Sequence, residues 1–249
     1  MIEPFKALKV DFESIQDSIS IMLEGGGSKT ALGALVKEEA HIGMSSYPFD
    51  LDKVLGSDHG INENVVAYDG IIIINNERNP VEELTNEQIS GIYNGNYTDW
   101  SQLGGDSGTI RPLIRNQRSG TQKFFVEHFK LNSVATSALV VDENKEIVKK
   151  VNNDVNSIGF IGFAYVTINV KDVKIPSDRF EYDSIFVYPS IRTIQEGNYP
   201  LKRSLRIYYK NDSNEQVKAF VAYIKSTRGQ EVLEQHGLIT SQSNLGSLE

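Results

Sequence analysis

The sequence contains no cysteine, which excludes disulfide bonds, thiolate metal sites and a cysteine nucleophile. It also lacks an apolar run near the ~18 residues that a membrane-spanning helix needs, and it shows no signal-peptide apolar segment. The longest apolar stretch, Ile71–Ile74, has the length of a buried strand. Functions that depend on sulfur chemistry or on a membrane span within this sequence are therefore not expected.

Histidine is scarce, and its spacing does not fit a metal site. The four histidines are His41, His59, His128 and His236. We expect neither a metal nor a cofactor.

An enzyme is the first competing interpretation, because several carboxylates lie close together in the sequence. They are Glu38, Glu39, Asp50 and Asp52. Solvated positions on a helix and a loop explain them better than catalytic pairing, and neither a Ser-His-Asp arrangement nor a phosphate-loop lysine motif accompanies them. We therefore predict that the protein is not an enzyme.

Basic residues are outnumbered, 25 against 33 acidic ones, and the formal net charge is −8. This sign argues against nucleic acid or an anionic membrane surface as the main partner. A small anion is still allowed, because neutral amides and one arginine can bind it locally.

The length of 249 residues suits two lobes that share a hinge better than one compact domain. Strand-like runs alternate with amphipathic helical runs, which predicts an α/β fold. We expect strands at 18–23, 41–44, 65–75, 110–114, 158–166 and 204–209. We expect helices at 2–12, from 28, from 86, from 121, at 143–152 and at 214–235.

Local signals support three of these helices. Thr85 and Gln88 form a capping-box pattern, and Phe125 and Phe129 stand four apart on one helix face. In the helix that begins at Ser28, one face is expected to pack on a core through Ala31, Leu32, Leu35 and Val36.

Two segments share the design of a strand, a tight polar loop and a helix start. They are Leu23–Thr30, with three glycines, and Arg115–Thr121. The first turn of a helix has amide N–H groups without helical partners, and it binds anions readily. Arg115 adds a planar fork that suits an oxyanion. Glycine before a serine N-cap is common at helix starts, so either loop alone can be purely structural. The spacing does not decide between this structural interpretation and anion binding.

A family resemblance extends this interpretation. From about residue 2 to 239, the chain resembles the PstS-like phosphate-binding component of the high-affinity phosphate ABC importer, with motifs in the same order. The matching segments are Asp69–Asn75, Asn79–Val81, Leu84–Thr85, Ile92–Gly95, Asp99–Trp100, Arg115, Arg118–Thr121, Ile158–Gly162 and Gly197–Arg203.

The resemblance implies a two-lobed α/β fold of the type II periplasmic-binding-protein kind. Each lobe would be a mixed sheet flanked by helices, with the ligand in the cleft between the lobes. We expect residues 1–70 and 204–245 in lobe 1 and residues 71–203 in lobe 2. Residues 246–249 are interpreted as a cloning remnant.

The resemblance also implies which residues bind phosphate. Ser28 matches the serine after the glycine run, and four residues of the second loop match the arginine and Ser-Gly-Thr that hold phosphate oxygens. Two serines match a further contact loop in lobe 1. The expected ligand residues are Ser28, Ser45, Ser46, Arg115, Ser119, Gly120 and Thr121.

The chain departs from the family pattern at Ser46. Some members have an aspartate there, which accepts a proton from phosphate, and others have a serine followed by arginine, where this chain has Tyr47. Asp50 is near in sequence and is a candidate replacement. Preference for phosphate over sulfate depends on such an acceptor, so specificity is a separate question from binding.

The second departure is at the start, where Met1 falls inside the helix that follows the family's first strand and its Gly-Ser-Thr-like loop. We expect an exposed sheet edge there, through which two chains could form a dimer. We also expect an upstream signal peptide with a lipobox cysteine, as in an extracytoplasmic lipoprotein.

The resemblance implies that the protein captures inorganic phosphate for the permease subunits of an ABC importer. The alternative is a sensory or structural domain of the same fold that has no ligand or binds another oxyanion.

Overall fold

A computed structural model describes residues 2–179 and 185–240, and these divide into two compact units. The first unit combines the chain up to Asp69, the segment Arg118–Gly120 and the chain from Arg203 onward, and the second combines 70–117 with 121–202. The changes of unit at 69/70 and 202/203 lie one residue from the predicted lobe boundaries, 70/71 and 203/204, and the two changes around Arg118–Gly120 were not predicted. The predicted remnant at 246–249 lies outside the described residues.

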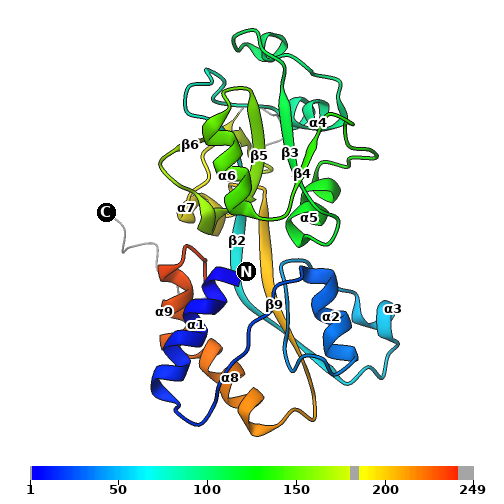
Figure 1. Ribbon diagram of the computed structural model, residues 1–249, viewed down its shortest axis with the longest axis vertical. Coiled ribbons are helices and arrows are strands. Elements are labelled where there is room, and N and C mark those ends of the chain that lie inside the picture. The colour runs from blue at the N-terminus through cyan, green and yellow to red at the C-terminus, as the bar shows by residue number, and fades with distance from the viewer. Residues whose placement is uncertain (1, 180–184, 241–249) are drawn as a thin grey trace. The chain divides into compact units, whose positions relative to one another are not determined.

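The chain passes from one unit to the other within the long strand β2 (Ile61–Asn76) and returns at the first residue of the long strand β9 (Lys202–Lys210). They are neighbours in the sheet, as Figure 1 shows. The apolar run Ile71–Ile74 is completely buried. The predicted strands at 65–75 and 204–209 are confirmed, since they lie within β2 and β9. Ile71–Ile74 suits a central strand because β-branched residues pack well when both faces of the sheet are buried.

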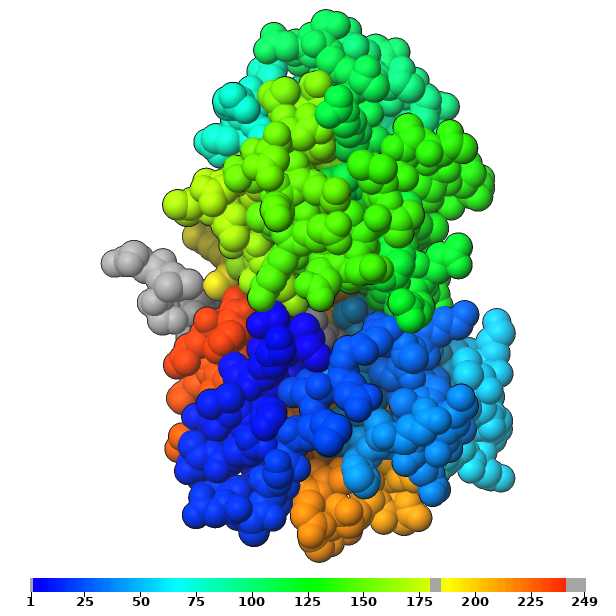
Figure 2. All heavy atoms as spheres, viewed as in Figure 1, coloured from blue at the N-terminus to red at the C-terminus, as the bar shows by residue number. Residues whose placement is uncertain are grey.

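In the first unit, helices surround the short pair formed by β1 and β9, which are antiparallel with Met44 opposite Ile207. Phe12 of α1 packs against the rings of Phe220 and Tyr223, each 5.1 Å away between centroids, and Figure 2 shows α1 in blue beside α9 in red. The elements are α1 (Ile2–Ile15), α2 (Ser28–Val36), β1 (Gly43–Ser45), α3 (Leu51–Leu55), α8 (Glu215–Lys225) and α9 (Thr227–Gln235).

The second unit is built on a mixed sheet in the order β2-β5-β3-β4, with β6 also paired to β2. β5 is antiparallel to β2 and parallel to β3, which is in turn parallel to β4. Phe125 stacks on Phe160 at 3.9 Å between ring centroids, and Tyr93 packs edge-on against both rings. This aromatic group is the centre of the unit's core.

The second unit contains both helices and strands, as the α/β class predicted, but β6, β7 and β8 follow one another with no helix between them in the described part of the chain. The helices are α4 (Asn86–Asn94), η1 (Trp100–Leu103), α5 (Gly120–His128), α6 (Asn144–Asn153), η2 (Phe163–Tyr165) and α7 (Ile191–Gln195). The strands besides β2 are β3 (Arg111–Arg115), β4 (Leu139–Val141), β5 (Ser157–Gly162), β6 (Val170–Asp172), β7 (Ile175–Pro176) and β8 (Phe186–Val187).

Most local predictions about helices are confirmed. Thr85 accepts a hydrogen bond from the amide of Gln88, whose side chain accepts from the amide of Thr85, so the capping box is complete. Phe125 and Phe129 are both buried. The predicted apolar face of α2 is narrower than expected, because Leu32 and Leu35 are buried while the side chain of Val36 is 45% exposed.

The strand predicted at 18–23 is wrong, because this segment has no strand conformation. Its apolar residues alternate, but no neighbouring strand within the described residues pairs with it, and the amide of Ile21 donates instead to the Glu13 carboxylate at 2.6 Å. The strand predicted at 158–166 ends early, at Gly162, where a 3-10 turn begins. Alternating apolar and polar residues therefore predict an extended backbone, and this backbone becomes a strand only where a neighbouring strand pairs with it.

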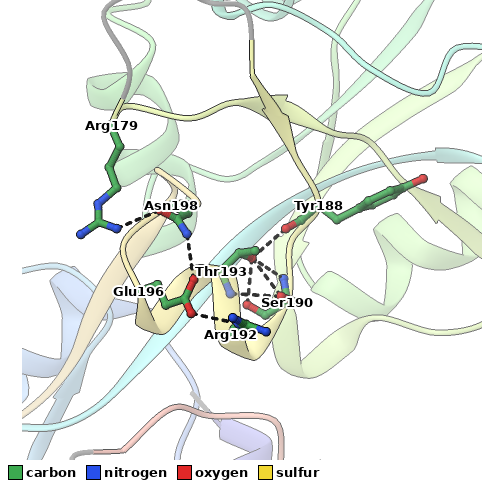
Figure 3. Close-up of polar contacts among 7 residues, drawn as sticks. All are labelled: Arg179, Tyr188, Ser190, Arg192, Thr193, Glu196 and Asn198. Atoms are coloured by element: carbon green, nitrogen blue, oxygen red, sulfur yellow. Dashed lines mark hydrogen bonds and ion pairs between the residues drawn. The ribbon is translucent and has the colours of Figure 1, made fainter. Parts of the chain in front are cut away.

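A chain of polar contacts fixes the turn that leads into β9 (Figure 3). Arg179 donates to Asn198 at 3.0 Å, and Asn198 donates to Glu196 at 2.8 Å. Ser190 caps α7 through a reciprocal contact with Thr193. These contacts hold the segment just before the buried residues Tyr199 and Leu201, from which β9 continues.

Asp172 of β6 is a partly buried carboxylate opposite Ile74 of β2. Its Oδ1 atom has no hydrogen-bond partner among the described residues. Burial raises the pKa of Asp172 to about 6. The folded protein therefore binds this proton more tightly than the unfolded chain, in which an aspartate has a pKa near ~3.9.

We predict a pH-dependent stability from this residue. The stabilisation from protonated Asp172 is complete below about pH 4 and is lost as pH rises through about 6. Asp172→Asn should remove that loss and raise the free energy of unfolding by about 1 kcal/mol at pH 7, relative to wild type. Urea unfolding from pH 4 to 7.5 tests this, with Asp212→Asn in an exposed turn as the control. An Asp172→Asn profile parallel to wild type would contradict the assignment.

Candidate functional site

A group of buried polar residues gathers in the first unit. We call it the serine–arginine cluster, and it consists of Ser28, Ser46, Asp69, Gly120 and Arg203. These residues come from the start of α2, the position just after β1, from β2, the start of α5 and β9. Buried polar groups are rarely left without hydrogen-bond partners, so the contacts within the cluster show how each of these groups is satisfied.

The start of α2 is shaped by the glycine before it. Gly27 has a φ of 88°, and a Cβ atom there would lie 2.4 Å from the carbonyl oxygen of Arg118. Only glycine allows both this conformation and this close approach. Gly27 provides no side-chain cap, so α2 begins with first-turn amides that lack a capping side chain and with the buried hydroxyl of Ser28.

Three contacts connect the two serines to Arg203. The amide of Ser46 donates to Ser28 Oγ at 3.1 Å, and the two Oγ atoms are 3.4 Å apart. Arg203 Nη1 donates to Ser46 Oγ at 3.2 Å. The hydroxyls are therefore held at the start of α2 by fixed donors.

Arg203 is held by a buried ion pair. Its Nε and Nη2 atoms donate to Asp69 Oδ2 at 3.1 and 2.6 Å, and the two side chains are only 3% and 5% exposed. Buried charges of this kind need such charge-assisted hydrogen bonds to offset their desolvation. The sequence analysis did not identify either residue as functional, although both lie within the segments that carry the family resemblance.

Gly120 lies against both serine hydroxyls. A Cβ atom at this position would be 2.3 Å from Ser28 Oγ and 2.6 Å from Ser46 Oγ. The backbone at the start of α5 therefore approaches the hydroxyls more closely than any other residue type would permit. Ser119, immediately before it, is also buried and belongs to the same unit.

Two residues proposed from the sequence have local roles in the structure. Ser45 Oγ donates to the carbonyl of Tyr47 at 2.5 Å and accepts from its amide at 3.0 Å, so this hydroxyl closes the loop after β1. Asp50 caps α3 by accepting from the amide of Lys53 at 3.1 Å. Both side chains therefore make their hydrogen bonds to backbone groups of nearby residues in the sequence.

Arg115 and Thr121 belong to the second unit. Arg115 ends β3, where its Nη1 donates to Asn144 Oδ1 at 3.0 Å and its Nη2 donates to the carbonyl of Asp142. Its amide donates to Gln122 at 2.9 Å. Thr121 is buried in the first turn of α5. The side chain of Arg115 is thus fixed beside the loop that leads into α6.

Three of the four carboxylates that suggested an enzyme, Glu38, Asp50 and Asp52, have local partners. Glu38 pairs with Lys210, which lowers the pKa of Glu38, and Asp52 lies 3.8 Å from His59. Within the described residues, no group of three or more histidine, aspartate or glutamate side chains could hold a metal ion. The same residues include no helix that is long and apolar enough to cross a membrane.

Two compact units of helices and mixed sheet make up this α/β fold, and it matches a known family. The model of the PBP superfamily domain matches residues 4–228. The chain belongs to this superfamily.

The similar proteins are phosphate-binding proteins. "Phosphate-binding protein PstS" of Borreliella burgdorferi is 26% identical over 239 residues, which cover 92% of this chain and 82% of that protein. The PstS of Staphylococcus saprophyticus is 28% identical and is matched over 87% of this chain and 70% of its own.

A solved structure from Clostridium perfringens, a putative phosphate ABC transporter substrate-binding protein with bound phosphate, is 28% identical to this chain. Its TM-score is 0.87, with 96% of this chain and 95% of that chain covered. An ABC-type phosphate transport receptor from Vibrio cholerae has a TM-score of 0.79 at 28% identity and covers 96% of both chains. The two-lobed α/β class predicted from the sequence is therefore confirmed.

We predict that Gly120→Ala destabilises the protein, because the added methyl group would overlap both serine hydroxyls. Overpacking of this kind costs about 1–3 kcal/mol of unfolding free energy. Gly33→Ala in α2 is the matched control, since nothing lies within 4 Å of a Cβ atom there, and it should stabilise the helix by up to about 1 kcal/mol. Urea denaturation of both variants provides the measurement. Equal stability of Gly120→Ala and wild type would contradict the packing of the cluster.

Proposed function

We propose that this protein captures inorganic phosphate and delivers it to an ABC importer. The observation that carries the proposal is the convergence of hydrogen-bond donors on the start of α2, where Ser28 and Ser46 lie against Gly120 with Arg203 behind them. A helix N-terminus with serine hydroxyls suits an anion whose oxygens accept hydrogen bonds. The relatives that are named for phosphate support the choice of this anion.

In the first unit, the proposed ligand groups are the first-turn amides of α2, the hydroxyls of Ser28, Ser46 and Ser119, and the amide of Gly120. Ser28, Ser46 and Ser119 are buried, and charged hydrogen bonds are stronger in such surroundings than in water. Ser45 is proposed to act through the shape of its loop, since its hydroxyl is engaged with Tyr47.

Arg115 and Thr121 of the second unit are proposed to add donors to the same anion. The guanidinium of Arg115 is already oriented by Asn144 and by the Asp142 carbonyl, so little side-chain freedom would be lost on binding. Their part in the site stays a prediction from the family resemblance.

The setting of this function also belongs to the proposal. We place the protein outside the cytoplasmic membrane as a lipid-anchored component that meets the importer's permease subunits, without catalytic activity of its own. Pairing of two chains through a sheet edge stays a prediction.

One observation favours a second candidate, a domain of the same fold that binds another oxyanion. By the family resemblance, Ser46 matches the position where some members have a proton-accepting aspartate, and in the structure its hydroxyl accepts from Arg203. A site that lacks such an acceptor has less means to reject sulfate.

A calorimetric titration tests the proposed function. Wild type should bind phosphate, and Arg115→Ala should weaken binding by about 2–4 kcal/mol, against about 1 kcal/mol for Thr121→Val. Arg111→Ala on the same strand is the matched control, because Arg111 is paired to Asp154 at 2.8 Å and should leave the affinity unchanged.

Three outcomes would count against this account. Wild-type affinity in Arg115→Ala would remove that residue from the site. Binding of sulfate without phosphate would favour the second candidate, whereas turnover of a phosphate ester by the purified protein would favour an enzyme.

A further inference from the structure

A polar pocket of about 280 Å³ lies within the second unit, where α4 and α5 both end. Small-molecule sites in proteins begin at roughly 300 Å³, so the pocket has the size for a small ligand. It shares no residue with the serine–arginine cluster. The polar residues that line it are Ser90, Asn94, Asn96, Lys130, Asn132 and Ser133.

The two helices end at this pocket with the same backbone arrangement but with different residues. In α4, Gly95 has a φ of 89°, and the next amide donates to the carbonyl of Gly91 at 2.7 Å. In α5, Lys130 has a φ of 51°, and the next amide donates to the carbonyl of Val126 at 2.9 Å. Glycine is the usual residue at this position, because a left-handed φ costs free energy for a residue with a Cβ atom. Lys130 therefore occupies a position where glycine would be more stable.

The side chain of Lys130 has no contact within the protein that explains this choice. One other non-glycine residue among the described ones has a positive φ, and it is Glu38 at the end of α2, with 61°. Its carboxylate forms an ion pair with Lys210. Lys130 is exposed, and within residues 2–179 and 185–240 its ammonium has no hydrogen-bond or ion-pair partner. A bound ligand would supply the missing partner, since strained residues are retained mainly where they serve a function.

The other polar side chains of the pocket offer both donors and acceptors. Ser90 Oγ donates to a carbonyl in the preceding turn of α4 at 2.8 Å, so its lone pairs are left to accept. Asn94 Oδ1 accepts from the amide of Asn96 at 3.1 Å, which leaves its NH₂ group to donate. Asn132 and Ser133 have no side-chain hydrogen bond among the described residues and can do both. Hydroxyl groups, which also donate and accept, match such a lining.

The charges around the pocket oppose one another. The C-terminal end of a helix carries partial negative charge, and two helices end here. The ammonium of Lys130 has the opposite sign, and no aspartate or glutamate is among the described residues that line the pocket. A neutral ligand is therefore favoured over an anion or a cation. Phe129 and Leu131 add apolar surface, which suits the carbon–hydrogen face of a sugar ring.

We propose that this pocket binds a neutral carbohydrate of the size of one hexose ring, with Lys130 donating to one of its hydroxyls. The ligand class follows from the size of the pocket, its paired donors and acceptors and its balanced charge. Because the pocket shares no residue with the proposed phosphate site, the proposal does not rest on the proposed function.

NMR titrations of the wild-type protein with glucose, galactose, mannose and N-acetylglucosamine test the proposal. Saturating inorganic phosphate is present throughout, so that the sugars do not compete for an anion site. At least one sugar should shift the amide signals of residues 131–133 and bind with a Kd of about 1–10 mM. Glucuronate and glucosamine, which carry one charge each, should bind no more tightly than the best neutral sugar.

Two variants of Lys130 separate the side chain from the backbone strain. Lys130→Gly and Lys130→Ala should both weaken sugar binding at least about fivefold, because both lose the ammonium donor. Lys130→Gly should also raise the Tm by about 2–4 °C, since it alone relieves the left-handed φ. Lys123→Ala is the matched control, because Lys123 is an exposed lysine of the same helix that does not line the pocket, and it should bind sugar like wild type.

Four results would overturn the proposal. One is that none of the four neutral sugars shifts the signals of residues 131–133 at concentrations well above about 10 mM. Another is that Lys130→Ala keeps the wild-type sugar affinity within about twofold. The third is a charged sugar that binds at least about tenfold more tightly than every neutral one, which would contradict the balance of charge. The fourth is a Tm of Lys130→Gly no higher than that of Lys130→Ala, which would remove the strain from which the inference starts.

Discussion

The buried ion pair between Arg203 and Asp69 is the interaction on which the rest of the first unit's polar cluster depends. It connects β2 and β9 at the residues where both strands belong to the first unit. Removing one partner of such a pair leaves an uncompensated buried charge, at a cost of about 3–5 kcal/mol. The pair therefore joins the two long strands and, through Ser46, orients the hydroxyls at the start of α2.

The cluster also shows how segments far apart in the sequence produce one site. Gly27 permits the backbone of Arg118 to approach the start of α2, and Gly120 permits the start of α5 to approach the serines. Both approaches are possible only because these residues lack a Cβ atom. The two glycines therefore provide the space that the close backbone contacts of the site need, and the ion pair holds Arg203 where it can donate to Ser46.

Local signals in the sequence were sufficient for most of the fold. The capping box at Thr85 and the apolar strand β2 were predictable because each depends on residues only a few positions apart. The contact between Arg203 and Asp69 was not predictable from local pattern, since it joins residues 134 positions apart. The segment 18–23 was misassigned for a related reason, because strand formation depends on a partner that alternation does not reveal. The role of Ser45 depends on the direction of one hydroxyl, which residue type does not specify.

The central claim is that the serine–arginine cluster binds an oxyanion. The most direct test is a crystal structure of the wild-type protein grown with inorganic phosphate. The account predicts an anion within hydrogen-bond distance of the Ser28 hydroxyl and the Gly120 amide, with Arg203 still bonded to Asp69 and Ser46. An anion bound elsewhere, with the start of α2 occupied by water or by a side chain, would contradict it.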